Sequence, residues 1–133
     1  MLAVGDDLAI LAGSGLKRLN SDGKVMWTAL WDKVDSWQDG RIVRLRGGDL
    51  VATRFGPISD SGVHVMRVTA LDGAKRWQSY CQPLEVSHSK YRHRAEITSD
   101  LGKLKLTSRG SAGTFIEWLD PQTGKQVRRT REK

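Results

Sequence analysis

The sequence predicts an all-β protein built from three four-stranded antiparallel units. Short runs of aliphatic and β-branched residues recur along the chain, and glycine-containing turns separate them. No window of eleven or more residues carries a helical apolar stripe. The nearest, Trp27-Leu30-Trp31-Val34, is followed by Asp35 and Gly40, which indicate a strand end and a loop. We therefore expect very little helix.

The strands follow from the apolar runs and the turns from their glycines. Tight turns are predicted at Gly47-Gly48, Asp22-Gly23 and Asp72-Gly73, because these pairs tolerate the left-handed backbone of a hairpin. The first strand of each unit is expected at 2–4, 41–46 and 92–98. Further strands are expected at 42–45 (within the second of these), 50–53, 63–71, 103–107 and 114–119.

The units form a repeat along the chain. The turn glycines Gly23, Gly73 and Gly124 recur at intervals of 50 and 51 residues, and the glycines that open each unit, Gly5, Gly48 and Gly102, at 43 and 54. A period of about 40–50 residues with four strands per unit is typical of β-propeller blades. We therefore expect one all-β domain over 1–133, with blades at about 1–33, 40–81 and 92–131.

The repeats resemble those of one known family. The segments LNSDGKVMW (19–27), TALDGAKRW (69–77) and WLDPQTGKQV (118–127) match an apolar strand, a Gly-Lys turn and a Trp. In this pattern they resemble the pyrroloquinoline-quinone-like propellers, typified by quinoprotein alcohol dehydrogenases. The resemblance implies that Trp27 and Trp77 pack between neighbouring blades. Trp118 departs from the pattern, and Val127 or Arg128 replaces the expected Trp.

The resemblance does not carry the enzymatic activity with it. Enzymes of that family place an adjacent pair of cysteines over the quinone, and this sequence has only Cys81. No match to their calcium ligands is found. No serine stands in a nucleophile pattern with a histidine, and no phosphate-binding loop precedes a helix. We therefore expect no cofactor and no enzyme activity, and predict a binding or interaction scaffold.

Three blades are too few for a closed ring, which needs roughly four to eight. Two copies make six blades, so a head-to-tail homodimer that closes a six-bladed ring is expected. A second polypeptide that completes the ring is one alternative. An up-and-down β-barrel of this length is the alternative fold.

The charge suggests two further functions. Lys and Arg total 22 against 15 Asp and Glu, a net charge of +7, which favours polyanions such as nucleic acid. On the innermost strands, four arginines would lie near a central channel and bind a small anion. They could equally pair with Glu96, Asp49 and Asp100 across strands. These channel candidates are Arg44, Arg46, Arg92 and Arg94.

Metal binding, secretion and membrane insertion find no support in the sequence. His88 and His93 are five residues apart, which puts them on opposite faces of a strand, so no metal site is predicted. Asp6 and Asp7 interrupt the start of the chain where a signal peptide is apolar, and no apolar run reaches the ~20 residues of a membrane helix. A cytoplasmic location is expected. The likeliest contact loops of the scaffold are 55–62 and 82–91.

Overall fold

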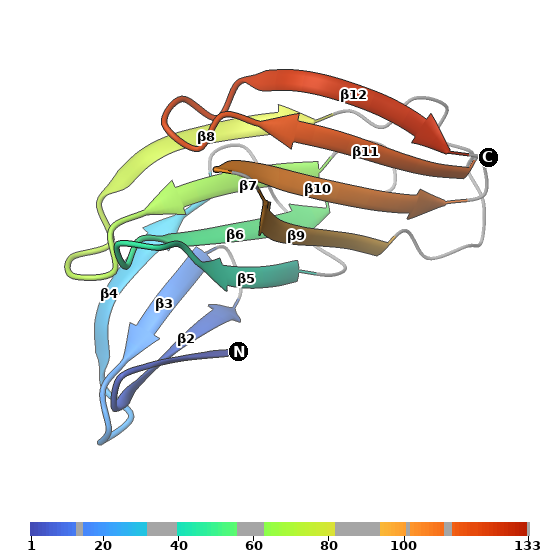
Figure 1. The fold of residues 1–133 in the computed structure, drawn as a ribbon. Coiled ribbons are helices and arrows are strands. Elements are labelled where there is room, and N and C mark those ends of the chain that lie inside the picture. The colour runs from blue at the N-terminus through green and yellow to red at the C-terminus, as the bar shows by residue number, and fades with distance from the viewer. Residues whose placement is uncertain are drawn as a thin grey trace.

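The computed structural model describes residues 1–12, 15–31, 40–55, 63–81, 94–100, 102–110 and 113–132. Within these residues the regular secondary structure consists of twelve β-strands, and no helix is present (Figure 1). The all-β prediction is confirmed. The described part of the chain contains no helix long and apolar enough to cross a membrane.

The strands form three separate four-stranded sheets. The first sheet contains β1 (Leu2–Val4), β2 (Asp7–Ala12), β3 (Gly15–Leu19) and β4 (Val25–Leu30). The second contains β5 (Gly40–Arg44), β6 (Leu50–Phe55), β7 (Val63–Val68) and β8 (Lys75–Cys81). The third contains β9 (Arg94–Asp100), β10 (Lys103–Gly110), β11 (Gly113–Leu119) and β12 (Gln126–Glu132).

Each sheet is an antiparallel meander in which strands pair in chain order. In Figure 1 the three sheets stack one on another, and β5 lies beside both β2 and β9. β5, an edge strand of the second sheet, therefore contacts both neighbouring sheets. The three four-stranded antiparallel units predicted from the sequence are confirmed.

The turns hold glycine where the backbone is left-handed. Gly23, Gly73 and Gly124 have φ angles of 81°, 73° and 73°, a conformation that strains any residue with a Cβ. The strand predicted at 63–71 ends earlier, at Val68. The reason is local: the Thr69 amide donates to the Ala74 carbonyl over 3.0 Å, which turns the chain before Gly73.

A β-bulge marks the same position in all three sheets. The register between the third and fourth strands shifts after Arg18, after Arg67 and after Trp118. These residues pair with Trp27, Trp77 and Arg128, respectively. The bulge therefore aligns the three units residue by residue, independently of their different loop lengths.

The core consists of two apolar layers, one on each face of the second sheet. The layer between the first and second sheets contains Leu16, Leu50 and Met66, all fully buried. The layer between the second and third sheets contains Val51, Leu104 and Leu106, also fully buried. Each such side chain contributes roughly 1.5–3 kcal/mol by leaving water. Counting only the described residues, the second sheet is therefore covered on both faces, whereas the first and third are each covered on one.

Candidate functional site

Among the described residues, no group of three or more His, Cys, Asp and Glu side chains could hold a metal ion. The features that distinguish the molecule are instead the contacts between its sheets and the faces that the stack leaves uncovered. We therefore take these surfaces as the candidate site.

A polar contact joins the first sheet to the second. The indole Nε1 of Trp27 donates to the Ala70 carbonyl over 2.9 Å, and Nη1 of Arg18 donates to the same oxygen over 2.6 Å. The Asp7 carboxylate accepts from Nε of Arg18 over 2.8 Å. Residues on three strands of the first sheet thus form one contact. Arg18 and Trp27 donate to a single carbonyl in the β7–β8 turn, and Asp7 binds Arg18.

The same contact recurs between the second and third sheets. Nε1 of Trp77 and Nη1 of Arg67 donate to the Pro121 carbonyl over 2.8 and 2.6 Å. The Asp49 carboxylate accepts from Arg67 over 2.9 Å. We call Asp7-Arg18-Trp27 and Asp49-Arg67-Trp77 the docking triads. The packing of Trp27 and Trp77 between neighbouring sheets, implied by the family resemblance, is confirmed.

A glycine in each receiving turn makes room for the indole ring. A Cβ on Gly73 would lie 2.4 Å from the Trp27 ring, and a Cβ on Gly124 would lie 2.4 Å from the Trp77 ring. Both distances are shorter than any real contact of a Cβ atom. Glycine is therefore required at 73 and 124 for two reasons: the backbone is left-handed, and a Cβ would collide with the indole ring that packs there.

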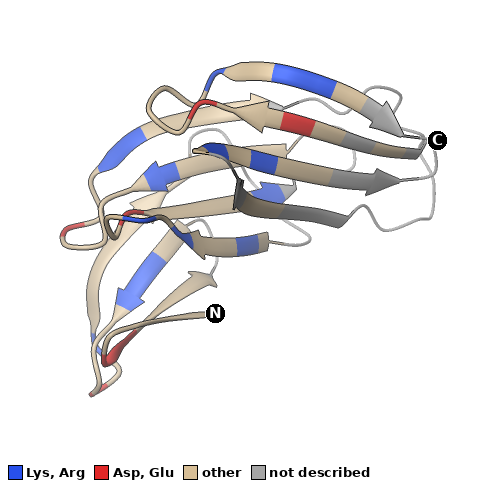
Figure 2. Cartoon of the chain, in the orientation of Figure 1, with Lys and Arg blue, Asp and Glu red and all other residues tan. Residues whose placement is uncertain are grey.

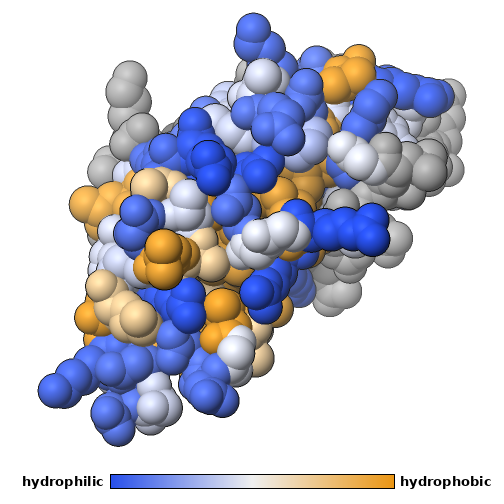
Figure 3. Space-filling view, turned by 60° about the vertical axis from the view of Figure 1, so that its left-hand side comes forward, coloured by the Kyte–Doolittle hydropathy of each residue, from blue (hydrophilic) through white to orange (hydrophobic). Residues whose placement is uncertain are grey.

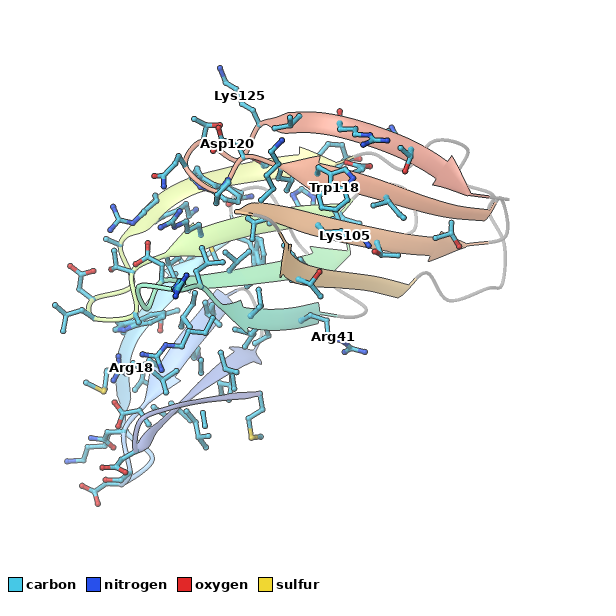
Figure 4. The ribbon with its side chains drawn as sticks, in the orientation of Figure 1. Arg18, Arg41, Lys105, Trp118, Asp120 and Lys125 are labelled. Carbon is cyan, nitrogen blue, oxygen red and sulfur yellow. The ribbon has the colours of Figure 1, made fainter. Side chains whose placement is uncertain are left out.

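The third sheet has no docking triad. The register places Lys103 at the position of Asp7 and Asp49, and Trp118 at the position of the triad arginines. Arg128 stands where the fourth-strand tryptophan is expected. The ammonium of Lys105 lies 5.4 Å from the centre of the Trp118 ring, a cation–π contact. Figure 4 shows Lys105 beside Trp118 on the third sheet.

The outer face of the first sheet is apolar and exposed. Strand alternation directs Leu8, Ile10 and Leu19 away from the second sheet, because their neighbours Ala9 and Leu16 point into the core. Leu8 and Leu30 are 39% and 56% exposed. In the space-filling view of Figure 3, hydrophobic side chains lie among charged ones over the lower part, where Figure 1 places this sheet. We call the following set the first outer face: Leu8, Ile10, Leu19, Val25, Met26 and Leu30.

The charged groups differ between the ends of the stack. Acidic residues lie at turns and on β11 in Figure 2. In the first sheet Asp6 and Asp22 lie in exposed turns, but Lys24 is exposed in the same turn as Asp22 and Lys17 lies on the outer face. The outer side of the third sheet carries Lys103 and Arg128, both exposed. The third-sheet end is therefore cationic, whereas the first-sheet end is apolar with charges of both signs nearby.

The four channel arginines are only partly described. Arg44 ends β5 and is exposed, and Arg46 is exposed in the turn that follows. Arg94 is the first residue of β9, its side chain is outside the described part, and Arg92 lies outside the described residues. Because β5 and β9 run in the same direction in Figure 1, Arg44 and Arg94 stand at opposite ends of neighbouring strands. The described residues do not bring them together, and a channel site stays a prediction.

The sequence analysis missed a buried polar cluster between the first and second sheets. Arg54 and His64 are almost fully buried, and the guanidinium of Arg54 lies 6.0 Å from the centre of the Trp31 ring. His64 contacts the Tyr80 ring at 4.9 Å between centroids. Burial lowers the pKa of Arg54 from its ordinary value. Nothing in the strand alternation distinguishes these two residues from surface residues before the stacking is known.

The contact loops predicted from the sequence are almost entirely outside the described residues, which omit 56–62 and 82–91. Comparison with known proteins adds no assignment: neither a scan against protein-family models nor a search of curated proteins returns a match. The geometry of the two outer faces is therefore the basis for a functional proposal.

Proposed function

We propose that this chain is a non-catalytic, propeller-type interaction scaffold that binds a further β-sheet on its first outer face. The observation that carries the proposal is the apolar outer face of the first sheet: Leu8 is exposed and Ile10 and Leu19 are half-buried, whereas their counterparts in the other two sheets are all fully buried. Leu50 and Leu104 occupy the position of Leu8, and both are fully buried by a neighbouring sheet. Contiguous apolar surfaces of this kind mark interaction sites.

A second copy of the chain is one source of such a sheet. In the head-to-tail ring expected from the sequence, the third sheet of one copy would cover the first sheet of the other. Such a ring would have six blade-like sheets, within the usual range for propellers.

Light scattering at two protein concentrations tests the proposal. If a second copy supplies the sheet, the mass of the native chain rises with concentration and the Leu30→Lys variant remains monomeric, because a lysine on the first outer face opposes burial. Leu71→Lys is the matched control: Leu71 is 84% exposed but lies in the β7–β8 turn. A native chain that stays monomeric throughout would exclude a second copy as the source of the sheet and leave a partner outside this chain.

A third-sheet variant separates the two geometries of a dimer. In the head-to-tail ring, Trp118→Ala weakens association as Leu30→Lys does, since the third sheet forms half of the interface. If two first outer faces meet each other instead, only Leu30→Lys has an effect. The ring would then be excluded, although binding through the first outer face would stand.

A second function, binding of polyanions, is favoured by the composition of the outer side of the third sheet. Lys103, Lys105 and Arg128 lie around the half-buried Trp118, which combines cations with an aromatic ring for stacking. Fluorescence anisotropy with a labelled single-stranded oligonucleotide tests it. We expect binding that weakens steeply with salt and is reduced in Trp118→Ala. Binding unaffected by this substitution would exclude the third sheet as the site.

A further inference from the structure

The two inter-sheet contacts predict what covers the first outer face. In both of them the preceding sheet contributes an Asp, an Arg and a Trp, and the following sheet contributes a turn carbonyl and a glycine. The first sheet supplies a docking triad to the second sheet, but its own turn receives none among the described residues. The question is therefore whether this turn has the features of the other two.

The β3–β4 turn has the same receiving features. The Asn20 amide donates to the Lys24 carbonyl over 2.9 Å, as the Thr69 amide does to the Ala74 carbonyl. Ser21 thus stands where Ala70 and Pro121 accept the triad donors. The turn is one residue shorter than its counterparts, yet Gly23 keeps their left-handed backbone. A Cβ on Gly23 would meet nothing within 4 Å, so the space taken by an indole ring beside Gly73 is open here.

We propose that the first outer face is the docking site for a four-stranded sheet that carries its own docking triad. Its Trp and Arg would donate to the Ser21 carbonyl, its indole ring would pack on Gly23, and its apolar face would cover Leu8 and Ile10. The inference rests on the proposed function and specifies the partner. It extends an interface that the molecule already forms twice.

A second copy of this chain fits the site less well than such a sheet. Both of its docking triads are already engaged with Ala70 and Pro121. Its third sheet would present Lys103, Trp118 and Arg128, in which the Arg and Trp positions are exchanged and a cation replaces the carboxylate that orients the arginine. The partner is therefore a sheet that is not part of residues 1–133.

A tandem protein supplies such a sheet for a direct test. A copy of residues 1–39 is joined ahead of Met1 of the full chain, so that residues 32–39 link the added sheet as they link the first sheet to the second. The added sheet carries Asp7, Arg18 and Trp27. The added sheet exposes the same apolar face that the single chain exposes at this end. The tandem and the single chain therefore differ in the new interface, and any gain in stability comes from that interface.

Oxidation of methionine by peroxide, followed by mass spectrometry, reads out the covered face. The full chain carries Leu8→Met and the added copy keeps Leu8, so that the introduced methionine reports the original first outer face. Leu8 is 39% exposed, whereas its counterparts Leu50 and Leu104 and the reference residue Met66 are fully buried. We expect the oxidation of the introduced methionine in the tandem to slow toward that of Met66, and the Tm to rise by on the order of 5 °C. An unprotected methionine at position 8 would overturn both this inference and the proposed function.

Gly23→Ala tests the docking triad separately. In the single chain this substitution strains only the backbone, whereas in the tandem a Cβ would also collide with the indole of the added sheet, as it would at Gly73. We expect the Tm loss to be at least twice as large in the tandem. Equal losses together with a protected methionine at position 8 would overturn the triad inference and leave the proposed function standing. Protection of that methionine by dimerisation of the single Leu8→Met chain would identify a second copy as the occupant and likewise overturn the inference.

Discussion

The first two sheets and the third share one backbone plan but differ in the side chains that face the next sheet. All three have a meander of four strands, a bulge at the same position and a left-handed glycine in the last turn. Within the described residues only the first two carry a docking triad, and each of these two triads contacts the following sheet. The comparison indicates that the triad couples sheets to each other and is not needed to form a sheet.

The largest expected difference is in the free energy of unfolding lost on substitution of Trp27 and of Trp118. Trp27→Ala removes a nearly buried ring and a hydrogen bond to Ala70, and should lower the free energy of unfolding by about 3–5 kcal/mol. Trp118→Ala should cost about 1 kcal/mol or less, because its ring contacts Lys105 on an outer side. Urea denaturation measures both. Equal losses would mean that the third-sheet tryptophan also holds sheets together.

A smaller difference in stability is expected among the residues at the start of the second strand of each sheet, which are Asp7, Asp49 and Lys103. Asp7→Asn and Asp49→Asn weaken the orientation of Arg18 and Arg67, and each should cost about 1–3 kcal/mol, as for hydrogen bonds to charged groups. Lys103→Asn at the equivalent position of the third sheet should change stability by about 0.5 kcal/mol or less. Urea denaturation again measures the three variants. A loss at Lys103 that matches the other two would contradict the assignment of the triads.

The smallest effect concerns pH and compares two turns. The Thr69 hydroxyl and the Ala74 amide donate to the Asp72 carboxylate, and they hold its pKa below the ordinary value. Since the folded pKa lies below the unfolded one, this stabilisation is present above the unfolded pKa and is lost as pH falls through the folded pKa. In the first sheet, the neutral side chain of Asn20 accepts from the Asp22 and Lys24 amides and has no such dependence.

Substitution of the hydroxyl partner tests this difference. Thr69→Val should raise the pKa of Asp72 toward that of a free aspartate, measured by NMR titration of its carboxyl carbon. The same titration in Asn20→Ala is the control, and the pKa of Asp72 should not move there. An unchanged pKa in Thr69→Val would show that the Ala74 amide alone sets it.

Much of the fold could be predicted from the sequence because its signals are local. Alternating aliphatic residues identify the strands, and glycine beside Asp or Gly identifies the tight turns. The departure of the third unit was also visible, since the position after Val127 holds Arg128 where the other units hold Trp. These features depend on residues that are only a few positions apart in the chain, so they are recognisable in the sequence alone.

The docking triads could not be predicted because their members are distant in sequence. Asp49 directly precedes β6 and Arg67 lies on β7, 18 residues further along the chain, and only the folded structure brings them together. The sequence analysis had offered Asp49 as a partner for the channel arginines, whereas the structure pairs it with Arg67 and Arg76. Likewise, the first outer face becomes recognisable only when the stack shows which side of each sheet is covered.

The placement of the acceptor carbonyls has a consequence for how the molecule opens. Trp27 reaches Ala70 and Trp77 reaches Pro121, so each contact links a sheet only to the next sheet along the chain. Stability in such an array is the sum of unit terms and nearest-neighbour terms. Local unfolding should therefore begin at either end of the stack, and the amide hydrogens of β6 and β7, in the sheet covered on both faces, should exchange last.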